Sequence, residues 1–178
     1  MFAIVLAALD RSGSVLPILC AMAVHELAHV VMMLACGGQV RRLTLRFADL
    51  QIAASGLGYR QELLSALAGP LVNLICGAAF CMQRPSFAAY SLMLGIYNLL
   101  PVWTRDGGRV LRCALLARLP ITQAEHISEI VSFAACAVLL LIGVFLTFFR
   151  KSGLWPLGTA AYLTVRLLML ARRTDTVQ

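Results

Sequence analysis

The chain has 178 residues, of which 61% are hydrophobic, and its formal net charge is +7. Its mean hydropathy of +0.86 is too high for an ordinary soluble domain, in which apolar residues make up about half of the total. The composition therefore excludes a soluble protein and predicts an integral membrane protein, with a single domain over residues 1–178.

Apolar runs along the chain predict an all-α polytopic fold of about five to six transmembrane helices. Residues 2–9 are too short to span a bilayer alone, and we expect them to form an abbreviated or re-entrant first span. A bilayer core takes about 20 apolar residues as a helix. Longer runs occupy residues 15–35, 63–80, 87–101, 130–149 and 154–170. We expect the core at residues 15–118, with 130–149 and 154–170 as additional C-terminal spans.

The segment after the first long run has the alternation of a β-hairpin. In residues 40–55, VRRLTLRFADLQIAAS, apolar and polar side chains alternate on both sides of Ala48-Asp49. This pattern predicts a short hairpin at the membrane surface, whose free edge could hold an extended peptide. An amphipathic connector that touches no substrate fits the pattern equally well.

The basic residues predict the orientation in the membrane. Ten arginines fall in alternate loops and at the C-terminus, whereas four basic residues fall on the other side. By the positive-inside rule, the loop after residue 35, the loop after residue 101 and the C-terminus are cytoplasmic. The arginines lie at span ends without interleaved aromatic residues, which excludes nucleic-acid binding. The six cysteines show no CxxC pairing and are expected to be small buried hydrophobes.

The first long run contains HELAH at residues 25–29, an HExxH motif. On a helix, the i, i+4 spacing puts His25 and His29 on one face, where both imidazoles can bind one zinc ion. Glu26 could then take a proton from a water on that ion. A bare HExxH also occurs by chance, but burying these groups in lipid without an ion costs several kcal/mol or more. The third histidine, His126, is expected to be solvated at a helix start.

Two histidines leave a catalytic zinc ion short of one protein ligand. Among the eight acidic residues, Asp106 is the best-placed candidate, because it follows the run at 87–101 at the same cytoplasmic edge as the HELAH helix. Asn98 and Pro101 break the helix before it, and Gly107-Gly108 allow a close turn. An Asp-Gly turn or a helix N-cap is the alternative explanation of Asp106.

The run at residues 63–80 contains a polar residue at membrane depth. Gly69-Pro70 is expected to bend this helix, and Asn73 offers an amide one turn later. Asn73 could serve catalysis, or it could only hold helices together.

Three motifs in this order resemble the site-2 protease family of intramembrane zinc metalloproteases: HELAH, AGPLVN at residues 68–73 and NLLPVWTRDGGRV at residues 98–110. The resemblance covers about residues 15–118 and is greatest to the compact branch that includes the sporulation sigma-factor-processing protease. It implies that His25, His29 and Asp106 bind Zn²⁺ and that Glu26 activates a water. It also implies that Asn73 orients or stabilises the reacting carbonyl.

The expected function is that of an endopeptidase in a bacterial cytoplasmic membrane. Its partners would be the lipid bilayer and a membrane protein substrate, cut in a transmembrane or membrane-associated segment near the cytoplasmic face. No residue pattern indicates an oligomeric state. The alternative is a non-catalytic metal-binding membrane protein or a partner-binding pseudoprotease, although such a relative would be expected to have lost Glu26 or a ligand.

Overall fold

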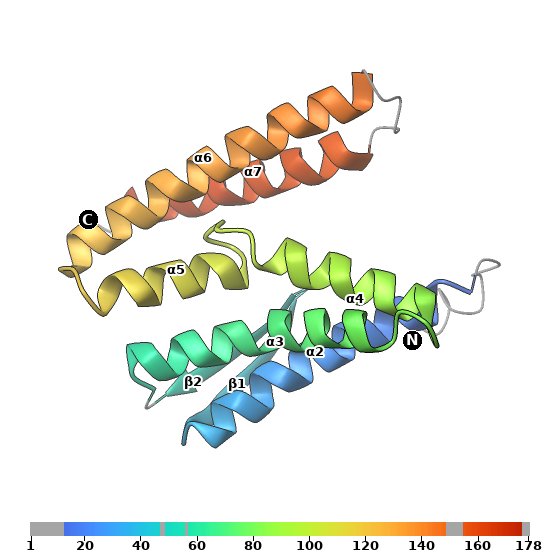
Figure 1. The fold of residues 1–178 in the computed structure, drawn as a ribbon. Helices are drawn as coiled ribbons and strands as arrows, with labels where there is room; N and C mark the ends of the chain where they lie inside the picture. The colour runs from blue at the N-terminus through green and yellow to red at the C-terminus, as the bar shows by residue number, and fades with distance from the viewer. Residues whose placement is uncertain (1–12, 47–48, 56, 149–154, 176–178) are drawn as a thin grey trace. The chain divides into compact units, whose positions relative to one another are not determined.

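The computed structural model describes residues 13–46, 49–55, 57–148 and 155–175 (Figure 1). The chain forms two compact units that divide between Leu99 and Leu100, and each unit is described by itself. In Figure 1 the first unit runs from blue to light green and the second from yellow-green to red.

Helix α2 (Val15–Ala35) carries the HELAH motif and has the bounds of the first predicted span. It ends before Gly37, whose φ of +79° is a left-handed conformation that glycine adopts without steric cost. The N–H groups of Gly37 and Gly38 donate to the carbonyls of Leu34 and Met33 at 2.9 and 3.0 Å. These bonds satisfy carbonyls of the last helical turn, which otherwise have no partner within the helix.

Two antiparallel strands follow, in the segment whose alternation predicts a hairpin. Strand β1 (Gln39–Arg46) pairs with strand β2 (Asp49–Ser55) in a two-stranded sheet. The register is irregular between Val40 and Arg42, as in a β-bulge.

Helix α3 (Tyr59–Ala79) begins earlier than the predicted run at 63–80 and continues through Pro70 as one helix. The early start has a local cause and a tertiary one. Gly58 is extended, with ψ of 166°, and its N–H donates to the Gln61 side chain at 2.9 Å. The Gln61 amide also donates to the Cys36 carbonyl at 3.1 Å, which ties the start of α3 to the end of α2. A polar first turn therefore precedes the apolar run.

Helix α4 (Pro85–Asn98) packs closely along α3 because small residues lie at their crossing. A Cβ atom at Gly77 would overlap the Leu92 side chain, and one at Gly95 would lie 3.0 Å from the Pro70 carbonyl oxygen. Glycine at both positions lets the two backbones approach, as is common for helices in membranes.

The second unit consists of helices α5 (Asp106–Leu116), α6 (Ile121–Phe148) and α7 (Trp155–Asp175). Helix α6 packs against both α5 and α7 (Figure 1). The predicted span at 130–149 begins nine residues too late, because the polar segment before it is already helical. Buried residues recur there every four positions, at Ala124, Ser128 and Ser132, so this first part of α6 is held by packing. His126 is exposed on α6, as expected for a solvated residue near a helix start.

Among the described residues, helices α2, α3 and α6 are long and apolar enough to cross a membrane. Each exposes large apolar side chains, for example Leu27, Ile75 and Leu141, which suits contact with lipid. The 14 residues of α4 are fewer than the roughly 20 that a straight span needs. Residues 2–9, the expected first span, lie outside the described residues. The described helices are those of an integral membrane protein.

Candidate metal centre

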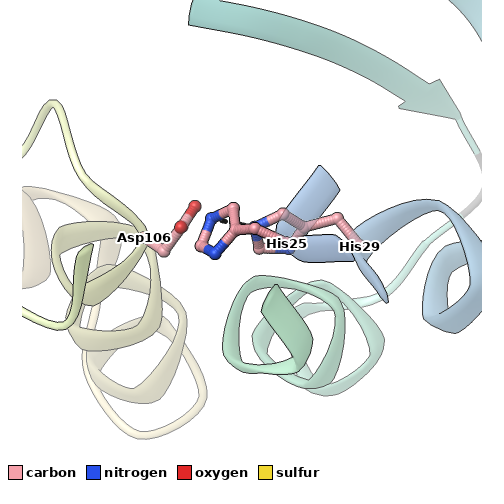
Figure 2. Close-up of side chains that lie close together, drawn as sticks. All are labelled: His25, His29 and Asp106. Atoms are coloured by element: carbon pink, nitrogen blue, oxygen red, sulfur yellow. Dashed lines mark hydrogen bonds between the residues drawn. The ribbon is translucent and has the colours of Figure 1, made fainter. Parts of the chain in front are cut away.

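His25 and His29 lie one turn apart on the same face of α2, as the motif predicts. Their side chains are buried in an otherwise apolar helix, with 4% and 6% of their surface exposed. The two Nε2 atoms are 3.1 Å apart and hydrogen-bonded, and the rings meet edge to face (Figure 2). Both imidazoles therefore present the same ring nitrogen to one small region.

A backbone carbonyl of α3 determines the tautomer of His29. The Nδ1 atom of His29 lies 2.6 Å from the carbonyl oxygen of Ser65. A carbonyl can only accept, so Nδ1 carries the proton and donates it. The Nε2 atom of neutral His29 then has a lone pair, which is the form that binds a metal ion. The Ser65 hydroxyl also donates to the His29 carbonyl, at 3.4 Å.

The His29 ring lies directly against the backbone of α3 at Gly69. A Cβ atom at Gly69 would overlap Nε2 and would lie 2.7 Å from Cε1 of the ring. Only glycine leaves room for the imidazole at this position. Gly69 therefore allows the His29 ring to pack against α3, a role in addition to the bend that the sequence predicts.

Two buried amides flank His25. The Nδ2 atom of Asn73, on α3, lies 3.3 Å from Nδ1 of His25. The Nδ2 atom of Asn98, at the end of α4, lies 3.5 Å from Nε2 of the same ring. Asn73 has none of its surface exposed, and Asn98 has 7%. Polar groups from three helices thus converge on one imidazole inside the first unit.

The remaining predicted residues lie beside this cluster in sequence or in the other unit. Glu26 is half-buried on α2, next to His25. Asp106, drawn with the two histidines in Figure 2, is the first residue of α5 in the second unit and is half-buried. The N-cap is Arg105, so Asp106 is not the cap that the alternative explanation proposed. A carboxylate in the first turn of a helix is still favourable, because it opposes the positive end of the helix dipole.

The backbone around Asp106 is closely packed within the second unit. Gly107 and Gly108 are buried, and a Cβ atom at Gly108 would overlap the Val102 carbonyl. The Trp103 N–H donates to the Ser132 hydroxyl at 3.0 Å, which ties this loop to α6. The start of α5 therefore packs against Val102, and the neighbouring Trp103 is bonded to α6.

The donor set fits a divalent metal such as zinc. Two nitrogen ligands at about 2.1 Å on a tetrahedral ion lie about 3.4 Å apart. The 3.1 Å between the two Nε2 atoms is close to that separation. With Asp106, the chain offers two imidazoles and one carboxylate, a set that catalytic zinc ions use.

Sequence reasoning missed Ser65 and the packing role of Gly69. The Ser65 contact is made by a backbone carbonyl, which any residue type carries, so no sequence signal could reveal it. Gly69 did carry a signal, because a glycine inside an apolar helix often marks a close approach. A bend at Gly69-Pro70 is the other structure that this signal predicts.

Comparisons with known proteins find sequence similarity to a zinc metalloprotease and to a sporulation protein. No protein-family model matches it. A zinc metalloprotease of Methanocaldococcus jannaschii is 26% identical over 67% of the chain and 39% of the relative. Stage IV sporulation protein FB of Bacillus subtilis is 27% identical over 70% of the chain and 47% of the relative. The chain thus spans less than half the length of these relatives.

The structure comparison agrees with the sequence comparisons. The solved structure of a site-2 protease from Methanocaldococcus jannaschii matches with a TM-score of 0.67 and 19% identity, over 94% of this chain and 83% of that one. At this identity the match shows a shared fold. Together with the sequence matches, it supports a relationship of this chain to the site-2 protease family.

Proposed function

We propose that the chain is an intramembrane zinc metalloprotease. The observation that carries the proposal is a pair of buried imidazoles, with Nε2 atoms 3.1 Å apart, next to Glu26 in a helix apolar enough to span a membrane. A buried polar cluster of this kind is expensive in lipid, and a bound cation offsets part of that cost. The names of the relatives, a zinc metalloprotease and a site-2 protease, support the same function.

His25, His29 and Asp106 are the proposed zinc ligands. Bound there, the ion would lower the pKa of a coordinated water and polarise the scissile carbonyl. The Ser65 carbonyl holds His29 in the tautomer that can bind, and Gly69 leaves room for its ring. Asp106 completes the usual count of three protein ligands.

Glu26 is the proposed general base. It follows His25 on α2, which puts its carboxylate beside the ligand pair in an HExxH helix. It would accept a proton from the attacking water and deliver it to the leaving amine nitrogen. Asn73 is the second proposed residue of the catalytic centre. Its amide contacts His25, and it would also orient or stabilise the reacting carbonyl.

The proposed substrate is a transmembrane or membrane-associated segment of another protein. A helix hides its carbonyls in its own hydrogen bonds, so the segment must unwind before it is cut. The basic residues favour cleavage near the cytoplasmic face, with the C-terminus in the cytoplasm of a bacterial cell. We further propose that α4 and α7 lie in the membrane, which brings the count toward five or six spans.

The test measures zinc content and cleavage on the full chain in detergent. Wild type should hold about one zinc per chain and cut a transmembrane peptide that contains helix breakers. Glu26→Gln should keep the zinc and lose cleavage, whereas His25→Ala should lose both. His126→Ala is the matched control, because it removes the exposed third histidine and should change neither.

The outcomes separate this function from its rival. Zinc without cleavage in wild type would favour the non-catalytic metal-binding protein. Wild type without zinc, or full cleavage by Glu26→Gln, would refute the proposal.

A separate variant tests the third ligand. Asp106→Asn keeps the size of the side chain but removes its charge, so zinc occupancy should fall while the fold persists. Unchanged zinc content in this variant would assign the third position to another residue.

A further inference from the structure

His25 and His29 belong to a chain of hydrogen bonds in which the donor and the acceptor of each bond can be assigned. Because the Ser65 carbonyl fixes the proton of His29 on Nδ1, the Nε2 atom of His29 accepts. The donor 3.1 Å away is then Nε2–H of His25. In this arrangement the proton of neutral His25 sits on the nitrogen that faces His29.

The Asn73 amide supports that tautomer of His25. With Nδ2 of Asn73 as the donor, Nδ1 of His25 must offer its lone pair, which again puts the ring proton on Nε2. His25 then has no lone pair on Nε2 for a metal ion. The hydrogen-bonded arrangement therefore suits the metal-free centre and opposes zinc binding through both Nε2 atoms.

The carbonyl oxygen of the same Asn73 amide could instead stabilise the other tautomer of His25, with the proton on Nδ1. The Oδ1 atom of Asn73 is buried and has no hydrogen-bond partner among the described residues, although such atoms are costly to leave unpaired. Rotating the amide by half a turn would bring Oδ1 to Nδ1 of His25. One N–H bond then breaks at Nε2 and one forms at Nδ1, so the charge of the ring is unchanged. The Nε2 lone pair becomes available to a cation.

A second amide already favours this other state. Nδ2 of Asn98 lies 3.5 Å from Nε2 of His25, and as a donor it needs a lone pair there. This contact is longer than the 3.3 Å contact of Asn73, so it is the weaker of the two. The two amides therefore stabilise different tautomers of one ring.

We propose that Asn73 is a positioning residue that selects the tautomer of His25, and that its Oδ1 accepts the Nδ1 proton when zinc is bound. This inference rests on the proposed function, since it assumes a zinc centre at His25 and His29. It adds a role at the metal ligand to the proposed contact of Asn73 with the reacting carbonyl. Its amide is fully buried and directed at the imidazole, so it acts on the metal ligand.

Zinc affinity of the full chain in detergent, measured by competition with a chelator, tests the proposal. Asn73→Leu removes the acceptor and should weaken zinc binding about 10–100-fold, as is usual for partners of metal-bound histidines. Asn73→Asp has the same shape and can only accept, so its affinity should equal or exceed that of wild type. Ser91→Ala is the matched control, because it is buried in the same unit and its hydroxyl has no described hydrogen-bond partner.

The zinc affinities of these variants decide whether Asn73 acts through His25. If Asn73→Leu and Asn73→Asp both bind zinc as wild type does, Asn73 does not act through His25 and the inference is wrong. Equal weakening in both variants, or in Ser91→Ala, would show damage to packing and would also overturn it. Wild type that binds no zinc would instead refute the proposed function.

A second measurement reads the tautomer directly. In zinc-free chain labelled with ¹⁵N-histidine, His25 of wild type should carry its proton on Nε2, and His25 of Asn73→Asp should carry it on Nδ1. Exposed His126 provides an internal reference in the same spectrum. The same tautomer in both proteins would contradict the proposal, whatever the stability of the variants.

Discussion

Gly69→Ala is the substitution that tests the geometry of the centre most directly. The new Cβ atom would lie 2.7 Å from Cε1 of His29, whereas ordinary contacts begin at 3.4 Å. The ring must therefore retreat by at least 3.4 − 2.7 = 0.7 Å. Metal–ligand distances vary by only about 0.2 Å, so this shift exceeds what the ion tolerates. We expect zinc affinity to fall about 10-fold or more.

The effect on folding should be smaller, because two terms oppose each other. Alanine in a helix interior is favoured over glycine by about 1 kcal/mol. Overpacking against the imidazole costs about 1–3 kcal/mol. The net loss of unfolding free energy is therefore expected to lie between about 0 and 2 kcal/mol. Thermal unfolding of the zinc-free chain measures this term separately from chelator competition.

Gly77→Ala provides the matched control on the same helix. Its Cβ atom would overlap the Leu92 side chain and approach the Ala88 carbonyl oxygen to 3.2 Å, so it also overpacks α3. It lies eight residues from Gly69, about 12 Å along the helix. It should lower stability and leave zinc affinity unchanged. Wild-type affinity in Gly69→Ala, or an equal loss in Gly77→Ala, would refute the placement of His29 against Gly69.

Two further predictions concern the second unit. Gly108→Ala should lower the unfolding free energy by about 2–3 kcal/mol, because its Cβ would meet the backbone carbonyl of Val102, which cannot rotate away. A change below about 1 kcal/mol in thermal unfolding would show that the loop can shift. The Arg112–Glu125 ion pair, at 2.9 Å, is partly exposed, so Glu125→Gln should cost at most about 1 kcal/mol. Arg112→Leu should cost more, because Arg112 also lies over the Trp103 ring at 5.9 Å, and equal costs would argue against that contact.

The bounds of a helix could be predicted where its apolar run ends at a residue that stops helices, such as glycine. The α2 helix meets this condition, because its apolar run stops at the glycine pair that turns the chain. The α3 and α6 helices do not, because each begins with a polar turn that hydropathy assigns to a loop. Those turns are helical because of tertiary contacts. Gln61 bonds to the end of α2, and Glu125 pairs with Arg112 of α5.

The site could be predicted as a set of residue types, but its pairings could not. A polar residue in an apolar helix is costly, so His25, His29 and Asn73 were each expected to have a task. Which atoms meet depends on contacts across 36 to 73 positions in the chain, and spacing within one helix does not encode them. Ser65 shows the limit most clearly, since its contribution comes from the main chain.

The arrangement around His25 explains why a single imidazole needs partners from two other helices. A histidine bound to zinc must present a lone pair, but a buried metal-free histidine must also satisfy both ring nitrogens, because an unpaired buried polar atom is costly. A backbone carbonyl, as at His29, can serve only one tautomer. A side-chain amide has an acceptor and a donor end, so Asn73 can satisfy His25 in both states by rotating. The two ligands therefore differ in character: His29 is fixed before the metal arrives, and His25 adapts when it binds.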